Sequence, residues 1–152
     1  MKISFTTKYK RSDTDLKMGL LIHATISPSE SNDHVGVYLR EKDLDDLVHS
    51  NELVGLPVRV EHGDSDVGTV ISAWRNGTQL DAVLKLNNDS IESMLISSCV
   101  QLGKCQELSL GYVVEMEMSK SGQLSGGKKR VHEVSLVKKG ARHSCKIHGW
   151  KK

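Results

Sequence analysis

The chain alternates apolar and polar residues over two long stretches, and this period of two constrains its fold more than any other feature. Every even position from Leu16 to Ile26 is apolar, and Cys105 to Met118 alternates in the same way. Successive side chains of a strand point to opposite faces, so each stretch predicts a strand with one buried face. In the second stretch Glu107, Ser109 and Gly111 share the face opposite the apolar residues.

Further strands and short helices fill the sequence between these stretches. Asn76-Gly77 predicts a tight hairpin, because both residues tolerate positive φ. Asn88 to Gln101 predicts a helix capped by Asp89, and Ser121 to Gly127 predicts a flexible turn. The apolar face of the helix predicted over Asn88 to Gln101 is formed by Ile91, Leu95, Cys99 and Leu102. The other predicted elements are a helix over Arg40 to Ser50 and strands over Leu56 to Glu61, Val67 to Trp74, Thr78 to Leu86 and Arg130 to Val137.

These elements predict a mostly β (α+β) fold: one barrel-like domain over residues 1–152 with a few surrounding short helices. The hydrophobic set makes up 38% and charged residues 26%, which is typical of a soluble globular protein. An aromatic content of 4% and a net charge of +2 argue against nucleic-acid binding. No apolar run is long enough for a membrane span or a signal peptide. The sequence therefore predicts an intracellular protein, whose cysteines we expect to be reduced thiols.

Three segments contain residues suited to acyl-transfer chemistry. His62 ends a predicted strand and precedes a glycine, and histidine is the common general base because imidazole titrates near neutral pH. Ser109 lies on the polar face of its strand, as a nucleophile must. His132 and Glu133 are both candidates to orient His62. Taken singly, each segment is more simply read as a surface histidine, an outward serine or a solvated strand end.

A competing group of residues lies near the C-terminus. His143, Cys145 and His148 carry imidazole and thiol groups, which are zinc ligands in many proteins. Their spacing matches no defined ligand pattern, and a fourth ligand is unassigned. We therefore predict no metal site and no cofactor.

In order, the three acyl-transfer segments resemble the herpesvirus maturational proteases (assemblins) and the prohead proteases of tailed phages. The segments that carry the resemblance are Leu56 to His62 with Val67 to Val70, Leu108 to Tyr112, and Glu133 to Arg142. The resemblance extends from about Leu16 to His148. It implies a serine endopeptidase with Ser109 as the nucleophile, His62 as the base, and an oxyanion loop formed by Gly140, Ala141 and Arg142.

The third member of the implied triad departs from the assemblins, which use a second histidine. An ungapped match places Glu133 at that position, and the phage relatives are also acidic there. Strand parity puts Glu133 on one face with Ser135, whereas His132 shares a face with Val134 and Leu136. We therefore expect Glu133 to orient His62, with His132 as the alternative.

The resemblance also implies partners. The expected substrates are the capsid scaffold protein and the enzyme's own precursor, and a homodimer is compatible with the family. The location would be the host nucleus for a herpesvirus-like protein and the bacterial cytoplasm for a phage-like one. Assemblins continue beyond their oxyanion loop, so the chain is either a compact version or a fragment of a longer precursor. The alternative function is a non-enzymatic, protease-like capsid-assembly module.

Overall fold

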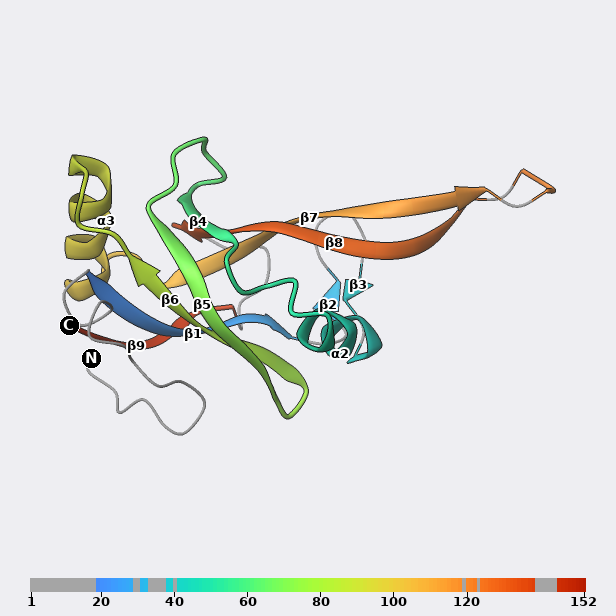
Figure 1. The fold of residues 1–152 in the computed structure, drawn as a ribbon, viewed down its shortest axis with the longest axis horizontal. Coiled ribbons are helices and arrows are strands. Elements are labelled where there is room, and N and C mark those ends of the chain that lie inside the picture. Colours follow the sequence, from blue (N-terminus) through green and yellow to red (C-terminus); the bar gives the residue numbers. More distant parts are fainter. Residues whose placement is uncertain are drawn as a thin grey trace.

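A computed structural model describes residues 19–28, 31–32, 38–39, 41–118, 120–122, 124–138 and 145–152. Seven strands form one sheet in the order β7-β8-β4-β5-β6-β1-β9, and β2 pairs with β3 separately (Figure 1). The strands are β1 (Leu20–Pro28), β2 (Ser31–Asn32), β3 (Tyr38–Leu39), β4 (Pro57–Val60), β5 (Gly68–Asn76), β6 (Gln79–Leu86), β7 (Glu107–Met118), β8 (Leu124–Val137) and β9 (Ile147–Lys151). The helices are α2 (Glu41–His49) and α3 (Ile91–Gln101).

The sheet curls until its two outer strands meet, which gives the mostly β, barrel-like fold that the alternation predicts. Glu107 at the start of β7 forms an antiparallel bridge with Lys146, just before β9. The Leu108 N–H donates to the Cys145 carbonyl at 3.0 Å, and the Ile147 N–H donates to the Gln106 carbonyl at 2.8 Å. In the described part of the chain these bonds pair the two edges at Gln106 to Leu108.

The alternating strands deliver one apolar face each to a common core. The core residues that β1, β6, β7 and β8 contribute include Leu20, Ile22, Ala24, Ile26, Leu80, Leu84, Leu108, Leu110, Val134 and Leu136. The predicted phase of β1 is confirmed over Leu20 to Ile26, while Leu16 lies outside the described residues. Leu21 and Thr25, on the opposite face of β1, are buried as well.

The strands β7 and β8 form a long hairpin that projects from the body of the molecule (Figure 1). Strand β8 begins at Leu124, so the flexible turn that the sequence predicts over Ser121 to Gly127 is wrong in its second half. Pairing to the partner strand extends it, since Met118 pairs with Leu124.

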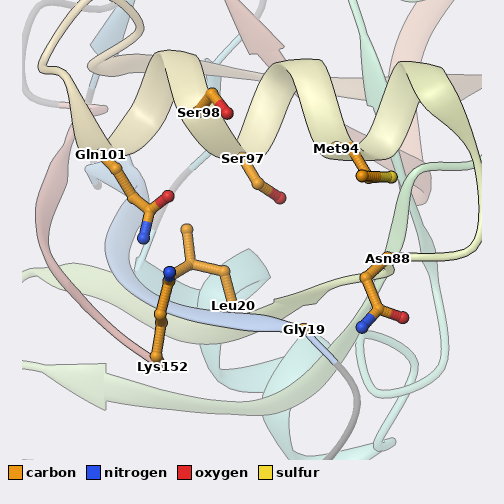
Figure 2. A pocket seen from close by; sticks show the side chains of 8 residues that line it. All are labelled: Gly19, Leu20, Asn88, Met94, Ser97, Ser98, Gln101 and Lys152. Carbon is orange, nitrogen blue, oxygen red and sulfur yellow. The ribbon is translucent and has the colours of Figure 1, made fainter.

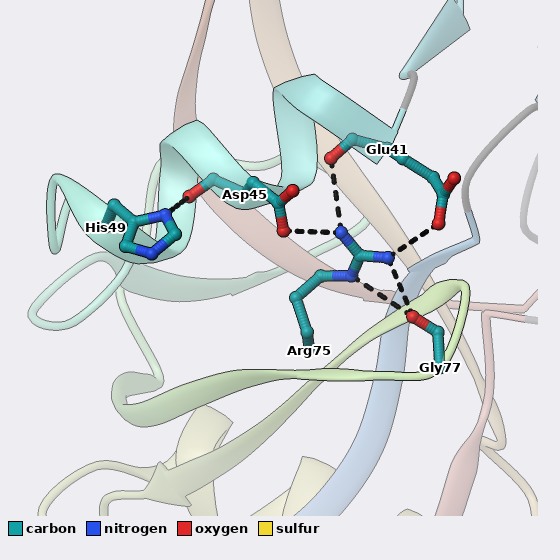
Figure 3. Close-up of polar contacts among 5 residues, drawn as sticks. All are labelled: Glu41, Asp45, His49, Arg75 and Gly77. Carbon is teal, nitrogen blue, oxygen red and sulfur yellow. Dashed lines mark hydrogen bonds and ion pairs between the residues drawn. The ribbon is translucent and has the colours of Figure 1, made fainter.

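Helix α2 is fixed against the β5–β6 hairpin by Arg75 (Figure 3). The Arg75 guanidinium forms ion pairs with Glu41 and Asp45 of α2 and donates to the Gly77 carbonyl of its own turn at 2.7 Å. Leu44 and Leu47 are buried on the inner face of α2, which confirms the amphipathic helix predicted over Arg40 to Ser50. None of the helices in the described ranges is long and apolar enough to cross a membrane.

Helix α3 differs from its prediction in its cap and in the face it buries. Ser90, not Asp89, is the N-cap: its hydroxyl accepts from the Ser93 N–H, and the Ser93 hydroxyl accepts from the Ser90 N–H. Aspartate and serine are both favourable N-cap residues, and the reciprocal hydrogen bond with Ser93 is what makes Ser90 the cap. The predicted apolar face is largely exposed, with Ile91 at 78% and Leu102 at 69%. The residues that α3 buries are Ser93 and Val100.

Candidate active site

Strand β8 lies between β4 and β7, and this arrangement brings the three sequence-predicted segments together. It runs parallel to β4, with Arg59 paired to Ser135, and antiparallel to β7, with Ser109 paired to the same Ser135. Two residues further along β7, Gly111 pairs with Glu133. The residues that follow β4 must therefore cross one strand to reach Ser109.

A left-handed turn at the end of β4 makes that crossing. Glu61 and His62 have φ values of 50° and 57°, a conformation that costs a non-glycine residue about 1–2 kcal/mol. Hydrogen bonds to β8 hold the turn. The Glu61 N–H donates to the Leu136 carbonyl at 3.0 Å, the His62 N–H donates to the Ser135 hydroxyl at 3.0 Å, and the Lys138 N–H donates to the Glu61 carboxylate at 2.7 Å. Strain held in this way is a feature of functional sites.

The turn places the His62 ring between Ser109 and Glu133. The Nε2 atom of His62 lies 3.0 Å from the Ser109 hydroxyl oxygen, and the Nδ1 atom contacts the Glu133 Oε1 atom. A carboxylate can only accept, so the Nδ1 atom carries the proton and the Nε2 lone pair faces the hydroxyl. The His62 side chain is 45% exposed, whereas Glu133 is 2% exposed. The hydroxyl therefore lies where solvent and a substrate reach the imidazole, with the carboxylate behind it.

The buried Glu133 carboxylate is satisfied on both oxygens, as burial of a charge requires. The Oε1 atom accepts from His62, and the Oε2 atom accepts the Ser135 hydroxyl proton at 2.6 Å. Space for the carboxylate comes from Gly111, where an added Cβ would lie 2.7 Å from the Glu133 Cδ atom. Ser135 and Gly111 therefore shape the position of Glu133 from two sides.

His132, the alternative third member, is exposed, and the contact to the His62 ring is made by Glu133. The pairing of β7 and β8 explains the difference. Gly111 pairs with Glu133 and Tyr112 with Val131, so His132 is the extra residue of a β-bulge. The bulge lies beyond Glu133, which leaves the parity between Glu133, Ser135 and Ser109 intact.

Two residues of the C-terminal group, Cys145 and His148, make their contacts elsewhere in the fold. Gly140, Ala141, Arg142 and His143 lie outside the described residues. The Cys145 thiol is buried and donates to the Ile26 carbonyl, and the His148 ring contacts the Thr25 hydroxyl. No group of three metal-ligating side chains is found in the part of the chain that the structure describes. Cys99, Cys105 and Cys145 are free thiols, as predicted.

Sequence reasoning missed the contacts of Ser135 and Glu61. Ser135 was placed on the face of Glu133, but its hydrogen bonds to Glu133 and the His62 backbone were not foreseen. The signal was present in the spacing, because a residue two positions from Glu133 on the same strand face lies beside its side chain. Glu61 gave no such signal, since its contact with Lys138 depends on the left-handed turn.

A hollow of about 380 Å³ lies on another part of the molecule, between α3 and the ends of β1 and β9 (Figure 2). Met94, Ser97 and Gln101 of α3 line one side, and Leu20 and Lys152 line the other. His62, Ser109 and Glu133 do not border it. It is therefore not part of the candidate active site.

Comparison with solved structures identifies the class of fold. The chain is similar to the protease of Kaposi's sarcoma-associated herpesvirus bound to a hexapeptide phosphonate inhibitor, with a TM-score of 0.60 and 16% identity over 88% of the chain. The same protease with an allosteric inhibitor gives a TM-score of 0.55 and 15% identity over 88% of the chain. With a dimer disruptor it gives a TM-score of 0.55 and 14% identity over 87% of the chain.

The chain thus has a herpesvirus-protease-like fold, as the sequence predicted. It spans 65% of the length of the protease bound to the hexapeptide phosphonate, and 78% and 76% of the other two. No family model matches the chain, and no curated protein matches it in sequence. At these identities the likeness establishes the fold, and the activity rests on the site.

Proposed function

We propose that the chain is a serine endopeptidase in which Ser109 is the nucleophile, His62 the general base and Glu133 the group that orients His62. One observation carries the proposal: a single imidazole touches a strand hydroxyl through Nε2 and a buried carboxylate through Nδ1. A hydroxyl, a base and an orienting group in that order are the requirements for activating a weak nucleophile.

Acylation follows from this geometry. The Ser109 Oγ atom forms a bond to the scissile carbonyl carbon while its proton passes to the His62 Nε2 atom. The imidazolium that results is stabilised by the Glu133 carboxylate on its other nitrogen. His62 then gives the proton to the amide nitrogen, the C–N bond breaks, and the amine product leaves an acyl-enzyme on Ser109.

Deacylation repeats the sequence with water as the nucleophile. His62 takes a proton from water, the water oxygen bonds to the acyl carbon, and the ester bond to Ser109 breaks as the proton returns to its Oγ atom. The negative oxygen formed in both steps requires donors nearby. We assign that role to the segment of Gly140, Ala141 and Arg142 on the resemblance alone.

The position of β7 at the edge of the sheet order supports an extended peptide as the substrate. Among the described residues, β7 is outermost in the sheet, and its pairing with the segment before β9 ends at Leu108. Ser109 directly follows the paired residues of this edge strand. A peptide that added there as a further strand would bring its carbonyl groups alongside the hydroxyl, with main-chain bonds that any sequence can make.

The protein class suggests which peptide this is. The fold is that of a herpesvirus protease, and the ordered motifs resemble both assemblins and phage prohead proteases. We therefore propose that the substrates are a capsid scaffold protein and the enzyme's own precursor, cleaved inside the infected cell. Dimer-disruptor complexes of the herpesvirus protease support a homodimer as the working assembly.

Labelling with diisopropyl fluorophosphate tests the enzyme assignment without knowledge of the cleavage site. We expect one adduct on Ser109, formed as fluoride leaves phosphorus, and none in Ser109→Ala or His62→Ala. Ser98→Ala is the matched control, because Ser98 is exposed on α3 and distant from the site. Wild-type protein that is folded but unlabelled at Ser109 would support the non-enzymatic capsid-assembly module.

Co-expression with the scaffold protein of the same genome tests the substrate. The wild-type chain should shorten the scaffold, and Ser109→Ala should leave it intact. Scaffold that stays whole beside a chain that labels at Ser109 would retain the endopeptidase and reject this substrate. Scaffold cleaved equally by Ser109→Ala would reject the nucleophile.

A further inference from the structure

The Ser135 side chain contacts both the base and its orienting carboxylate. It is fully buried, at 0% exposed, near the C-terminal end of β8. Its hydroxyl donates to the Glu133 Oε2 atom at 2.6 Å and accepts the backbone N–H of His62 at 3.0 Å. One oxygen atom thus joins the turn that carries the imidazole to the carboxylate that the imidazole contacts.

We propose that Ser135 is a positioning residue of the endopeptidase, acting on His62 and Glu133 together; the inference rests on the proposed function. The direction of both hydrogen bonds is fixed. The Glu133 carboxylate only accepts and the His62 N–H only donates, so the hydroxyl gives its single proton to the first and a lone pair to the second. The Ser135 hydroxyl can therefore make both hydrogen bonds in only one orientation.

This fixed orientation aligns the remaining parts of the site. Holding the Oε2 atom leaves the Glu133 Oε1 atom directed at the His62 Nδ1 atom. Holding the His62 N–H keeps the left-handed turn closed over β8, so the ring reaches Ser109. A small displacement of the His62 ring lowers the reaction rate, because the Nε2 atom must already lie within hydrogen-bond distance of the Ser109 hydroxyl.

The position of Ser135 in the sheet makes a small hydroxyl residue necessary. It pairs with Arg59 of β4 on one side and with Ser109 of β7 on the other. Alanine at 135 would leave the His62 N–H and one Glu133 oxygen without this partner in a buried place. Unlike a nucleophile, Ser135 contacts no substrate, so its loss should slow the reaction without changing what is cleaved.

A double-mutant cycle measures this role through the rate of Ser109 labelling by diisopropyl fluorophosphate. We expect Ser135→Ala to lower that rate by about 10-fold to 100-fold, the range for loss of a hydrogen bond to a charged group. Ser135→Thr, which keeps the hydroxyl, should restore most of the rate. In a Glu133→Gln background, Ser135→Ala should cost less than it does in wild type, because the contact with the charged partner is already gone and only the contact with the His62 N–H remains to be lost.

The matched control is Ser93→Ala, since Ser93 is a fully buried serine that caps α3 away from the site. It should lower the unfolding midpoint and leave the labelling rate within about 2-fold of wild type. If Ser135→Ala does not fold, Ser135→Cys keeps the volume with a weak donor and should show the same loss of rate.

The outcomes separate the inference from the proposed function. Folded wild-type protein that is not labelled at Ser109 overturns the endopeptidase itself. Wild-type labelling with an equal rate in Ser135→Ala overturns the positioning role alone. Losses that multiply independently in the Ser135→Ala, Glu133→Gln double variant would also overturn it, since they would show that Ser135 does not act through Glu133.

Discussion

Gly111 pairs with Glu133 across the β7–β8 ladder and leaves the space that the Glu133 carboxylate occupies. A Cβ at position 111 would lie 2.7 Å from the Glu133 Cδ atom and 2.9 Å from its Cγ atom. The carboxylate has to move to admit it. The strand that carries Ser109, the proposed nucleophile, therefore also sets the position of Glu133, the group proposed to orient His62.

We accordingly expect Gly111→Ala to lower the Ser109 labelling rate by about 100-fold, because the displaced carboxylate no longer meets the His62 Nδ1 atom. Rates of labelling by diisopropyl fluorophosphate measure the effect, with thermal unfolding as a check of the fold. In a Glu133→Ala background the added methyl has room, and Gly111→Ala should then change the rate little. An unchanged rate for the single variant would mean that the carboxylate position does not matter.

Glu133→Gln should lower the rate of peptide cleavage by about 1,000-fold to 10,000-fold, the scale seen when an orienting carboxylate becomes an amide. The amide can present the wrong polarity to the Nδ1 atom and cannot stabilise the imidazolium. His132→Gln is the matched comparison, because His132 is the adjacent exposed residue at the bulge. A larger loss in His132→Gln than in Glu133→Gln would reverse the choice of third residue.

The grouping of Ser109, His62 and Glu133 could be predicted because strand parity survives between Glu133 and Ser135 in β8. Ser135 and Glu133 keep the pairing that puts them on one face with Ser109, because the bulge at His132 lies outside the stretch from Glu133 to Ser135. The strand ends before His62 as expected. The left-handed turn there could not be predicted, because hydrogen bonds to β8 hold Glu61 and His62 at positive φ and those bonds exist only in the folded sheet.

Local residue preferences predicted the type of each helix, strand or turn better than the residues at which it begins and ends. The hairpin after β5 turns at Gly77 and Thr78, because Asn76 still pairs with Gln79. Gly77 has φ 62°, which corrects the predicted Asn76-Gly77 turn by one residue. The Asn76 amide instead donates to Asp81 at 3.0 Å. That contact comes from the tertiary packing of β5 on β6, which dipeptide preferences do not contain.

Burial raises the pKa of the Cys105 thiol to about 11, from an ordinary value of 9.0, with smaller contributions from Cys99, Glu61 and Glu107. The folded state therefore favours the neutral thiol. This contribution to stability is fully present below about pH 9 and is lost as the pH rises towards 11. Denaturant unfolding across this range should show a steeper fall for wild type than for Cys105→Ala. Equal slopes would contradict the raised pKa.

The outer face of β1 carries a second polar cluster whose titration should be visible in stability. Asp81 is 1% exposed and accepts from His23, Thr25 and Asn76, and the Thr25 hydroxyl lies 2.6 Å from the His148 Nε2 atom. The His23 and His148 ring centroids are 5.1 Å apart. Burial is the largest effect on His148 and lowers its pKa; Asp81 opposes this, while His23 and Lys146 add to it.

Because the pKa of His148 is lower in the folded state than its ordinary 6.5, the folded state favours the neutral ring. Stability is then present above about pH 6.5 and is lost as the pH falls through the folded pKa, since the unfolded chain binds the proton first. His148→Gln keeps a donor for Thr25 and removes the titration, so its unfolding midpoint should fall less on acidification. His49→Gln, at an exposed histidine of α2, should follow wild type. A His148→Gln profile that falls as steeply as wild type would show that this imidazole does not sense the pH.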